Sequence, residues 1–259
     1  MTRPKRDTLL DRNHFVGAVG NAFQVLDVFG RANKSLAHSE VVRQTGQPKA
    51  SVHRILSTFL SLGVVARDHD GKYRLTLKLW GLGMAAYANL DLVRTAQPVI
   101  ESLKLATDEI AHLAVLDGSS CVTYLWKSEC LRPARVQFWV GMRTRSWRSS
   151  TGRSMLAFLP QQVENLLSSP EIRYDHVGKD SLLDALQKVR GSGFAISRGD
   201  NDPERGGVAA PIRDHTGVVV ASCGIAASSN RITNDLIRRC VPEVLKASVR
   251  ISSQLGFRA

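Results

Sequence analysis

The sequence predicts two domains, a small helical domain that ends in a β-hairpin and a larger α+β domain with a largely antiparallel sheet. The chain has 259 residues, which is long for one domain and sufficient for two. Its hydrophobic content of 43% and charged content of 22% are ordinary, so both domains can bury a core. Helical apolar spacing dominates the N-terminal part, and long strand hairpins flanked by helices follow it, which indicates the α+β class.

Three helices are expected in the first domain. Apolar residues with i, i+3, i+4 and i+7 spacing predict a first helix over residues 22–29. A short second helix contains Val41, begins near Ser39 or His38 and ends before Gly46, which suits a left-handed position after a helix. Pro48 is expected in the first turn of the third helix, where its missing N–H is not needed.

The third helix has one apolar face and one polar face. At 100° per residue, five apolar residues share one side: Val52, Ile55, Leu56, Phe59 and Leu60. The opposite side carries Arg54 among small and hydroxyl-bearing residues, with Lys49 and His53 on a flank and no acidic residue. Residues 64–76 then contain two β-prone runs around an Asp-Gly pair, which predicts a hairpin with a tight turn.

The pattern is helical again from Leu77 to about Ala106, which we interpret as a linker helix followed by the first helix of the second domain. Beyond it, residues 111–126 and 207–226 are hairpin candidates and residues 134–141 and 194–197 are strand candidates. Helices are expected over residues 152–159, 161–169, 181–193 and 233–255. The expected organisation is a flexible arm (1–14), the helical domain with its hairpin (15–77), a linker helix (78–95) and the α+β domain (96–259).

The charge of the chain indicates a polyanionic partner. The net charge is +12 and the pI is near 10, which favours nucleic acid or a membrane surface. Residues 1–79 contain 13 Lys and Arg against 6 Asp and Glu, so the excess is densest at the N-terminus. No apolar run approaches the 18 or so residues of a membrane span, and we expect no membrane association. The four cysteines lack paired metal spacing, so reduced thiols, a cytoplasmic location and no metal site are expected.

The acid-free face of the third helix has two interpretations. It is either the solvated side of a small packing unit or a surface that enters the major groove of double-stranded DNA, where small side chains allow close approach and Arg54 can bond to guanine. The local charge and the basic hairpin favour DNA. His53 is either a partly packed flank residue or a base-contacting residue. The predicted DNA-binding residues are Ser39, Lys49, Ala50, Ser51, His53, Arg54, Ser57, Arg67, Lys72 and Arg74.

The stretch from His38 to Leu75 ("HSEVVRQTGQPKASVHRILSTFLSLGVVARDHDGKYRL") resembles the winged helix-turn-helix of the IclR family of bacterial transcriptional regulators. The family's linker helix resembles "LWGLGMAAYANL", and its C-terminal domain resembles "HLAVLDG", "GRSMLAFLP", "VAAPIRDHTGVVVASCGI" and "NRIT". The resemblance covers about residues 16–256. It implies a GAF-like effector-binding domain, operator binding controlled by a small organic effector, and homodimers that can pair into tetramers.

The resemblance also implies where the effector binds. The expected effector-binding residues are Trp126, Val136, Trp147, Ser149, Ser150, Thr151, Ser197, Gly207 and Gly224. Independently of the family, the run Ser149–Gly152 before a helix is either an anion site or a plain helix N-cap, and both roles are compatible.

Five positions of this domain differ from the residue types that the family often has there. His is replaced by Trp147, an acidic residue by Ser197, Cys by Gly207, and Ser by Gly224 and Ala226. A less polar lining with more space favours a larger, flatter effector, such as an aromatic one. The usual metal ligands are missing, so metal binding is not expected.

The residues indicate no enzyme. "TGRSML" lacks the second glycine of a nucleophile elbow, and "GLGMAA" lacks the strand-turn-helix context of a dinucleotide site. No carboxylate cluster for a catalytic metal is visible. The alternative, a small-molecule enzyme with an accessory DNA-binding module, has no motif in its favour.

Overall fold

The computed structural model describes residues 15–32, 34–87, 91–130, 139–173 and 178–258. The chain divides into two compact units, residues 1–89 and 90–259. No helix in the described ranges is long and apolar enough to cross a membrane.

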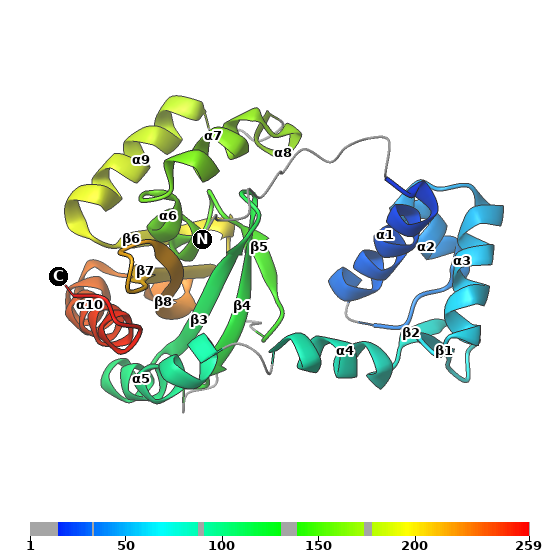
Figure 1. Ribbon diagram of the computed structural model, residues 1–259, viewed down its shortest axis with the longest axis horizontal. Coiled ribbons are helices and arrows are strands. Elements are labelled where there is room, and N and C mark those ends of the chain that lie inside the picture. Colours follow the sequence, from blue (N-terminus) through cyan, green and yellow to red (C-terminus); the bar gives the residue numbers. More distant parts are fainter. Residues whose placement is uncertain (1–14, 33, 88–90, 131–138, 174–177, 259) are drawn as a thin grey trace, which may run out of the picture. The chain divides into compact units, whose positions relative to one another are not determined.

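The first unit confirms the predicted order of helices and hairpin (Figure 1). Its elements are α1 (Gly17–Ala32), α2 (His38–Thr45), α3 (Lys49–Ser61), β1 (Val65–Arg67), β2 (Tyr73–Leu75) and α4 (Leu77–Tyr87). The predicted apolar face of α3 is buried at Val52, Leu56 and Phe59, and it packs against α1 and α2 in one core. The face predicted from a period of 3.6 residues is therefore the packed face.

The turn between α2 and α3 depends on Gly46. Its backbone has φ of +67°, and its N–H donates to the carbonyl of Val42 at 3.0 Å, so it ends α2 as predicted. Pro48 differs from the prediction by one position, because it is the N-cap before α3 and not a residue of the first turn. Both residues reverse the chain between the two helices.

The hairpin after α3 has a three-residue loop in place of the predicted tight two-residue turn. The amide of Asp68 donates to the carbonyl of Lys72 at 2.8 Å, and Gly71 takes the left-handed conformation with φ of +73°. The Asp68 carboxylate accepts the amide N–H groups of Asp70 and Lys72 at 3.0 and 2.9 Å. Tyr73 also exchanges two backbone hydrogen bonds with Leu36, so the hairpin is joined to the segment before α2.

The second unit is an α+β domain built on an antiparallel sheet, as predicted, and its strand order is β5-β4-β3-β8-β7-β6. Its strands are β3 (Ile110–Asp117), β4 (Cys121–Ser128), β5 (Arg143–Arg145), β6 (Ala195–Asp202), β7 (Arg205–Arg213) and β8 (Val219–Ser228). Its helices are α5 (Asp91–Thr107), α6 (Ser150–Leu156), α7 (Pro160–Ser168), α8 (Pro170–Arg173), α9 (Lys179–Ser192) and α10 (Asn234–Gln254), with a short 3-10 turn at Ser229–Arg231. Figure 1 shows α5 and α10 on one face of the sheet and α6, α7 and α9 on the other.

The helical region predicted from Leu77 to about Ala106 contains two helices, as expected. Within the range expected for the linker helix (78–95), α4 ends at Tyr87 and α5 begins at Asp91. An acidic residue in its first turn suits a helix start, and Val93 and Ala96 are already buried in the second unit. The predicted strand at residues 134–141 lies mostly outside the described residues, and β5 and α8 had no sequence signal.

We expect Gly46→Ala to destabilise the first unit by about 1 kcal/mol, because a left-handed backbone is strained for any residue with a Cβ. A Cβ there would meet no atom within 4 Å, so the effect isolates backbone strain. Gly30→Ala is the matched control, since Gly30 lies in α1 with equal space and ordinary φ, and it should stabilise by about 0.5–1 kcal/mol. Amide hydrogen exchange of α2 and α3 measures both changes. Equal effects of the two variants would contradict this account.

Candidate functional sites

The polar face of α3 is open to solvent. Lys49, Ala50, His53, Arg54 and Ser57 are exposed on it and Ser51 is half-buried. The hydroxyls of Thr58 and Ser61 donate to carbonyls one turn back within the helix, so they are already satisfied. The face is therefore narrow, cationic and free of acidic side chains.

The N-terminus of α3 concentrates positive charge. Its N-cap Pro48 offers no side-chain acceptor to the first amides, and its first turn contains no acidic residue. Lys49 stands in that turn and is exposed, although a cation is disfavoured at the positive end of a helix. Such an arrangement is suited to an external anion such as phosphate.

The predicted DNA-binding residues outside α3 differ in their contacts. Ser39 is exposed on α2, and the exposed His53 ring meets the His38 ring edge-on at a centroid distance of 6.1 Å. Arg67 is exposed but engaged within the hairpin, because its guanidinium donates to the Tyr73 hydroxyl at 2.9 Å and stacks over that ring.

The other two hairpin cations are accessible. Arg74 is exposed on β2, and the Lys72 ammonium lies 4.0 Å from the Asp70 carboxylate in an exposed pair. Such a pair is weak in water and leaves the cation available.

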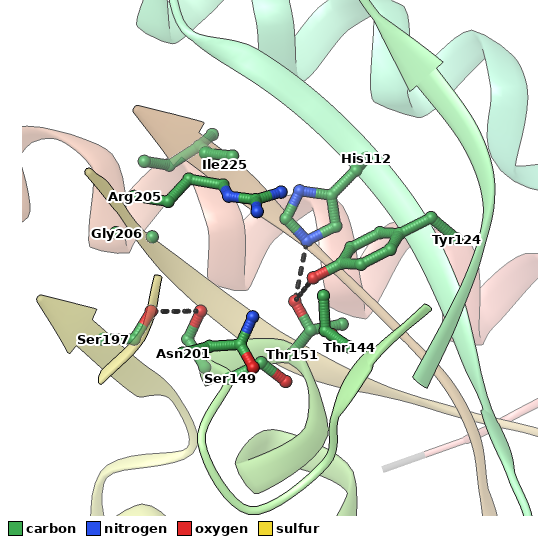
Figure 2. A pocket seen from close by; sticks show the side chains of 13 residues that line it. His112, Tyr124, Thr144, Ser149, Thr151, Ser197, Asn201, Arg205, Gly206 and Ile225 are labelled. Atoms are coloured by element: carbon green, nitrogen blue, oxygen red, sulfur yellow. Dashed lines mark hydrogen bonds between the residues drawn. The ribbon is translucent and has the colours of Figure 1, made fainter. Parts of the chain in front are cut away.

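A cavity of about 40 Å³ lies in the second unit, between the start of α6 and the face of the sheet that α6 covers (Figure 2). Strands from every part of the sheet contribute to it. The lining residues are His112, Tyr124, Thr144, Ser149, Ser150, Thr151, Ser197, Asn201, Arg205, Gly206, Gly207, Ile225 and Ala226.

Hydroxyl groups around this cavity make three separate sets of hydrogen bonds. Thr151 Oγ1 lies 2.9 Å from His112 Nε2 and accepts from the Tyr124 hydroxyl at 3.5 Å. The hydroxyls of Ser197 and Ser150 are 3.4 Å apart. Ser149 accepts the amide N–H of Gly152 at 3.0 Å, so the run Ser149–Gly152 contains the N-cap of α6, which is one of its two predicted roles.

His112 is held neutral in this cavity. The side chain is buried, and burial lowers its pKa to about 3 from an ordinary value of 6.5, because the charged form would lose its hydration. The ring packs edge-on against Tyr124 at 5.1 Å. At neutral pH His112 therefore offers a hydrogen bond and an apolar ring, but no charge.

Ion pairs hold the end of β6 and the start of β7 beside the cavity. Arg153 on α6 donates to the Asp200 carboxylate and to the Ile196 carbonyl, both at 2.6 Å. Arg205 pairs with Asp202 at 2.6 Å. Hydrogen bonds from the Glu204 amide and from Arg205 lower the pKa of Asp202, so the pair stays charged.

Profiles of known families match both units. Residues 18–69 match the IclR helix-turn-helix domain, and residues 84–253 match the C-terminal domain of the bacterial transcriptional regulator IclR.

The chain belongs to the IclR family of bacterial transcriptional regulators.

Relatives of this IclR-family chain are named as transcriptional regulators. KipR of Bacillus subtilis is 31% identical over 86% of this chain and 91% of its own length, and KdgR of Escherichia coli is 30% identical over 93% and 94%. The structure of an IclR homologue from Microbacterium hydrocarbonoxydans complexed with 4-hydroxybenzoate is 25% identical, with a TM-score of 0.73 over 92% of this chain and 98% of that one. A Brucella abortus IclR-family regulator, 24% identical over 94% of each chain, shares the fold with a TM-score of 0.75.

The cavity contains five of the nine effector-binding residues that the family resemblance implied: Ser149, Ser150, Thr151, Ser197 and Gly207. Of the other four, the three that the structure describes are not part of its lining. Trp147 is only 2% exposed and packs with the helices of the α6–α9 face, which supports the core interpretation. Trp126 is half-buried on β4 away from the cavity, and Val136 lies outside the described residues. At Gly224 a Cβ would lie 2.3 Å from the Val208 carbonyl oxygen, so this glycine serves close backbone packing.

Residues that the sequence did not single out complete the lining, chiefly His112, Tyr124, Thr144, Asn201 and Arg205. His112 belongs to the motif "HLAVLDG", but no local sequence pattern identified the other four residues. Their presence makes the lining more polar than predicted, and the volume of about 40 Å³ is smaller than the roomy pocket expected. Among the described residues, no group of three or more His, Cys, Asp or Glu side chains is placed to hold a metal ion.

The depressed pKa of His112 predicts a pH-dependent stability of the second unit. His112 binds a proton near pH 6.5 in the unfolded chain, but only near pH 3 in the folded chain. Stability is therefore fully present above pH 6.5 and is lost as pH falls toward 3, with a slope of up to about 1.4 kcal/mol per pH unit. His112→Gln should remove this slope in urea unfolding measured from pH 7 to 4. His215→Gln, at an exposed position of the same unit, should keep it; a slope unchanged in His112→Gln would refute the account.

Proposed function

We propose that this IclR-family regulator binds its operator by placing α3 in the major groove. The observation that carries this proposal is the exposed, acid-free face of α3, with Lys49 at the positive end of the helix and Arg54 one turn further on. Phosphate contacts position a protein on DNA, and contacts to base edges give specificity. Lys49, Lys72 and Arg74 suit phosphate contacts, whereas Arg54 suits a guanine edge.

The remaining predicted residues have supporting roles in this proposal. Ala50 and Ser51 allow the backbone of α3 to approach the base pairs, and Ser57 and Ser39 contribute hydrogen bonds. Arg67 stabilises the hairpin through Tyr73 more than it contacts DNA. His53, exposed beside His38, is the least favoured DNA contact among these residues.

The second unit is proposed to bind a small organic effector in the cavity beneath α6. The support comes from the polar lining and from the Microbacterium relative, which was solved with 4-hydroxybenzoate. A cavity that holds benzene has a volume of roughly 150 Å³. An aromatic effector would therefore require the lining side chains to move. A two- or three-carbon acid would require a smaller movement of these side chains.

Self-association is the third part of the proposal. Large apolar side chains of the first unit are exposed on and before α1 (Phe15, Val16, Val19, Phe23) and on α4 (Leu77, Trp80, Leu82). A helix that is apolar on several sides is normally buried, so a second copy is a suitable partner for these surfaces. Homodimers, which can pair into tetramers, would present two α3 helices to a two-fold operator. A cytoplasmic location follows from binding chromosomal DNA.

The DNA-binding part of the proposal is tested with two cations and a control. Arg54→Ala should weaken operator binding by about 1–3 kcal/mol and relax base preference at one position. Lys72→Ala should weaken binding to all sequences about equally and lower the salt slope by about 1. Lys188→Ala, which removes an exposed cation from α9 in the second unit, should change neither.

Fluorescence anisotropy with a panel of operator variants at several salt concentrations measures these effects. Unchanged base preference in Arg54→Ala would refute its role as a base-contacting residue. An effect of Lys72→Ala on one operator only would refute its role at phosphate.

The effector-binding part is tested by a thermal-shift screen with 4-hydroxybenzoate, related aromatic acids, glyoxylate and pyruvate. A true effector raises the melting temperature in a concentration-dependent way, because it binds the folded chain. We expect aromatic acids to be among the stabilising compounds. Stabilisation by two- and three-carbon acids alone would exclude an aromatic effector, and no stabilisation by any compound would argue against the site.

A further inference from the structure

Arg205 reaches from β7 into the cavity of the second unit, toward His112 (Figure 2). One N–H group of its guanidinium is on the Asp202 carboxylate at 2.6 Å, and another is on the sulfur of Met142 at 3.1 Å. A thioether is a weak acceptor, and a guanidinium matches the geometry of a carboxylate much better. The contact with Met142 is therefore one that a carboxylate ligand would readily replace.

Thr144 on β5 contributes a second feature to the same cavity. The residue is only 8% exposed, and its Oγ1 has no hydrogen-bond partner among the described residues. A buried hydroxyl without a partner is costly and uncommon in a native protein. The hydroxyls of Ser149, Ser150 and Thr151 around the same cavity all have partners within the chain, so Thr144 is distinct from them.

The charge of the lining points to an anion. Of the described residues that line the cavity, Arg205 carries the only permanent charge, and no carboxylate is among them. Asp202, which pairs with Arg205, is outside the lining and also accepts the amide of Glu204 at 3.0 Å. The carboxylate of Asp202 thus keeps a partner when the guanidinium shifts toward a ligand.

We propose that Arg205 and Thr144 together bind a carboxylate group of the effector. The guanidinium N–H now on the Met142 sulfur donates to one carboxylate oxygen, and the Thr144 hydroxyl donates to the carboxylate as well. The remainder of the ligand then lies against the Gly206–Gly207 backbone and Ile225. The inference rests on the proposed effector site and assigns to it two specificity-determining residues and an acid in preference to its neutral analogue.

Small probes test this without knowledge of the natural effector. Formate and acetate, whose size suits the small cavity, are titrated against the full chain by thermal shift, with chloride at equal ionic strength and acetamide as the neutral partner of acetate. The pair 4-hydroxybenzoate and 4-hydroxybenzamide makes the same comparison for an aromatic ring. We expect carboxylates to raise the melting temperature. Their amides should bind at least tenfold more weakly, and should therefore raise it less at equal concentration.

Three variants locate the effect. Arg205→Met should weaken carboxylate binding by about 10- to 100-fold, the range for losing hydrogen bonds to a charged group. Thr144→Val should weaken it by roughly 2- to 10-fold while leaving the ligand-free melting temperature equal or higher, because no internal hydrogen bond is lost. If the Thr144 hydroxyl were merely structural, Thr144→Val would lower the ligand-free melting temperature and leave carboxylate binding unchanged. Arg198→Met is the matched control, since exposed Arg198 bonds to Asn234 outside the cavity and should bind as the wild type.

The outcomes separate this inference from the proposed function. Equal stabilisation by acid and amide, or carboxylate binding that survives Arg205→Met, would overturn the inference and leave an effector site in place. If no carboxylate stabilises the chain although a neutral compound does, the inference again fails alone. If no compound of any charge binds, the effector site itself is refuted, whereas operator binding by α3 is still tested by the DNA measurements.

Discussion

The cavity of the second unit depends on the close approach of α6 to the sheet. A Cβ on Gly207 of β7 would lie 3.2 Å from the Ser150 hydroxyl oxygen of α6, and one on Gly152 of α6 would lie 2.1 Å from the carbonyl oxygen of Ser146 in the turn before the helix. Glycine, which has no Cβ, permits both close approaches. A 2.7 Å hydrogen bond between the hydroxyls of Ser154 and Ser222 joins α6 to β8. These contacts fix the start of α6 over the sheet, and the cavity is the space that remains between them.

In the first unit, one residue of α3, Lys49, stands at a position that its charge does not favour. Most of α3 obeys ordinary rules, because its apolar face is buried and its hydroxyls bond within the helix. Lys49 does not, since a cation at the start of an uncapped helix is locally unfavourable. Natural proteins break such rules mainly at functional sites. The conflict is relieved when an anion such as a DNA phosphate sits at that end.

The sequence predicted those parts of the structure that depend on neighbouring residues. Periodicity located α1, α3, α10 and the β7–β8 hairpin, because burial of one face leaves a local pattern. The cavity was only half predicted. Thr144 and Arg205 belong to strands at different positions in the order β5-β4-β3-β8-β7-β6, and such long-range pairing has no local signal. Trp147 and Gly224 had motif positions but serve packing, which only the assembled contacts reveal.

If the chain is a regulator that binds both an operator and an effector, as proposed, occupancy of the cavity in the second unit and DNA binding by the first unit must be energetically coupled. Linkage requires this coupling to be reciprocal. The decisive measurement is the change in operator affinity at saturating effector, compared with the change in effector affinity at saturating operator. The account predicts the same factor in both directions, about 5- to 150-fold. An operator affinity that is independent of a ligand shown to occupy the cavity would contradict it.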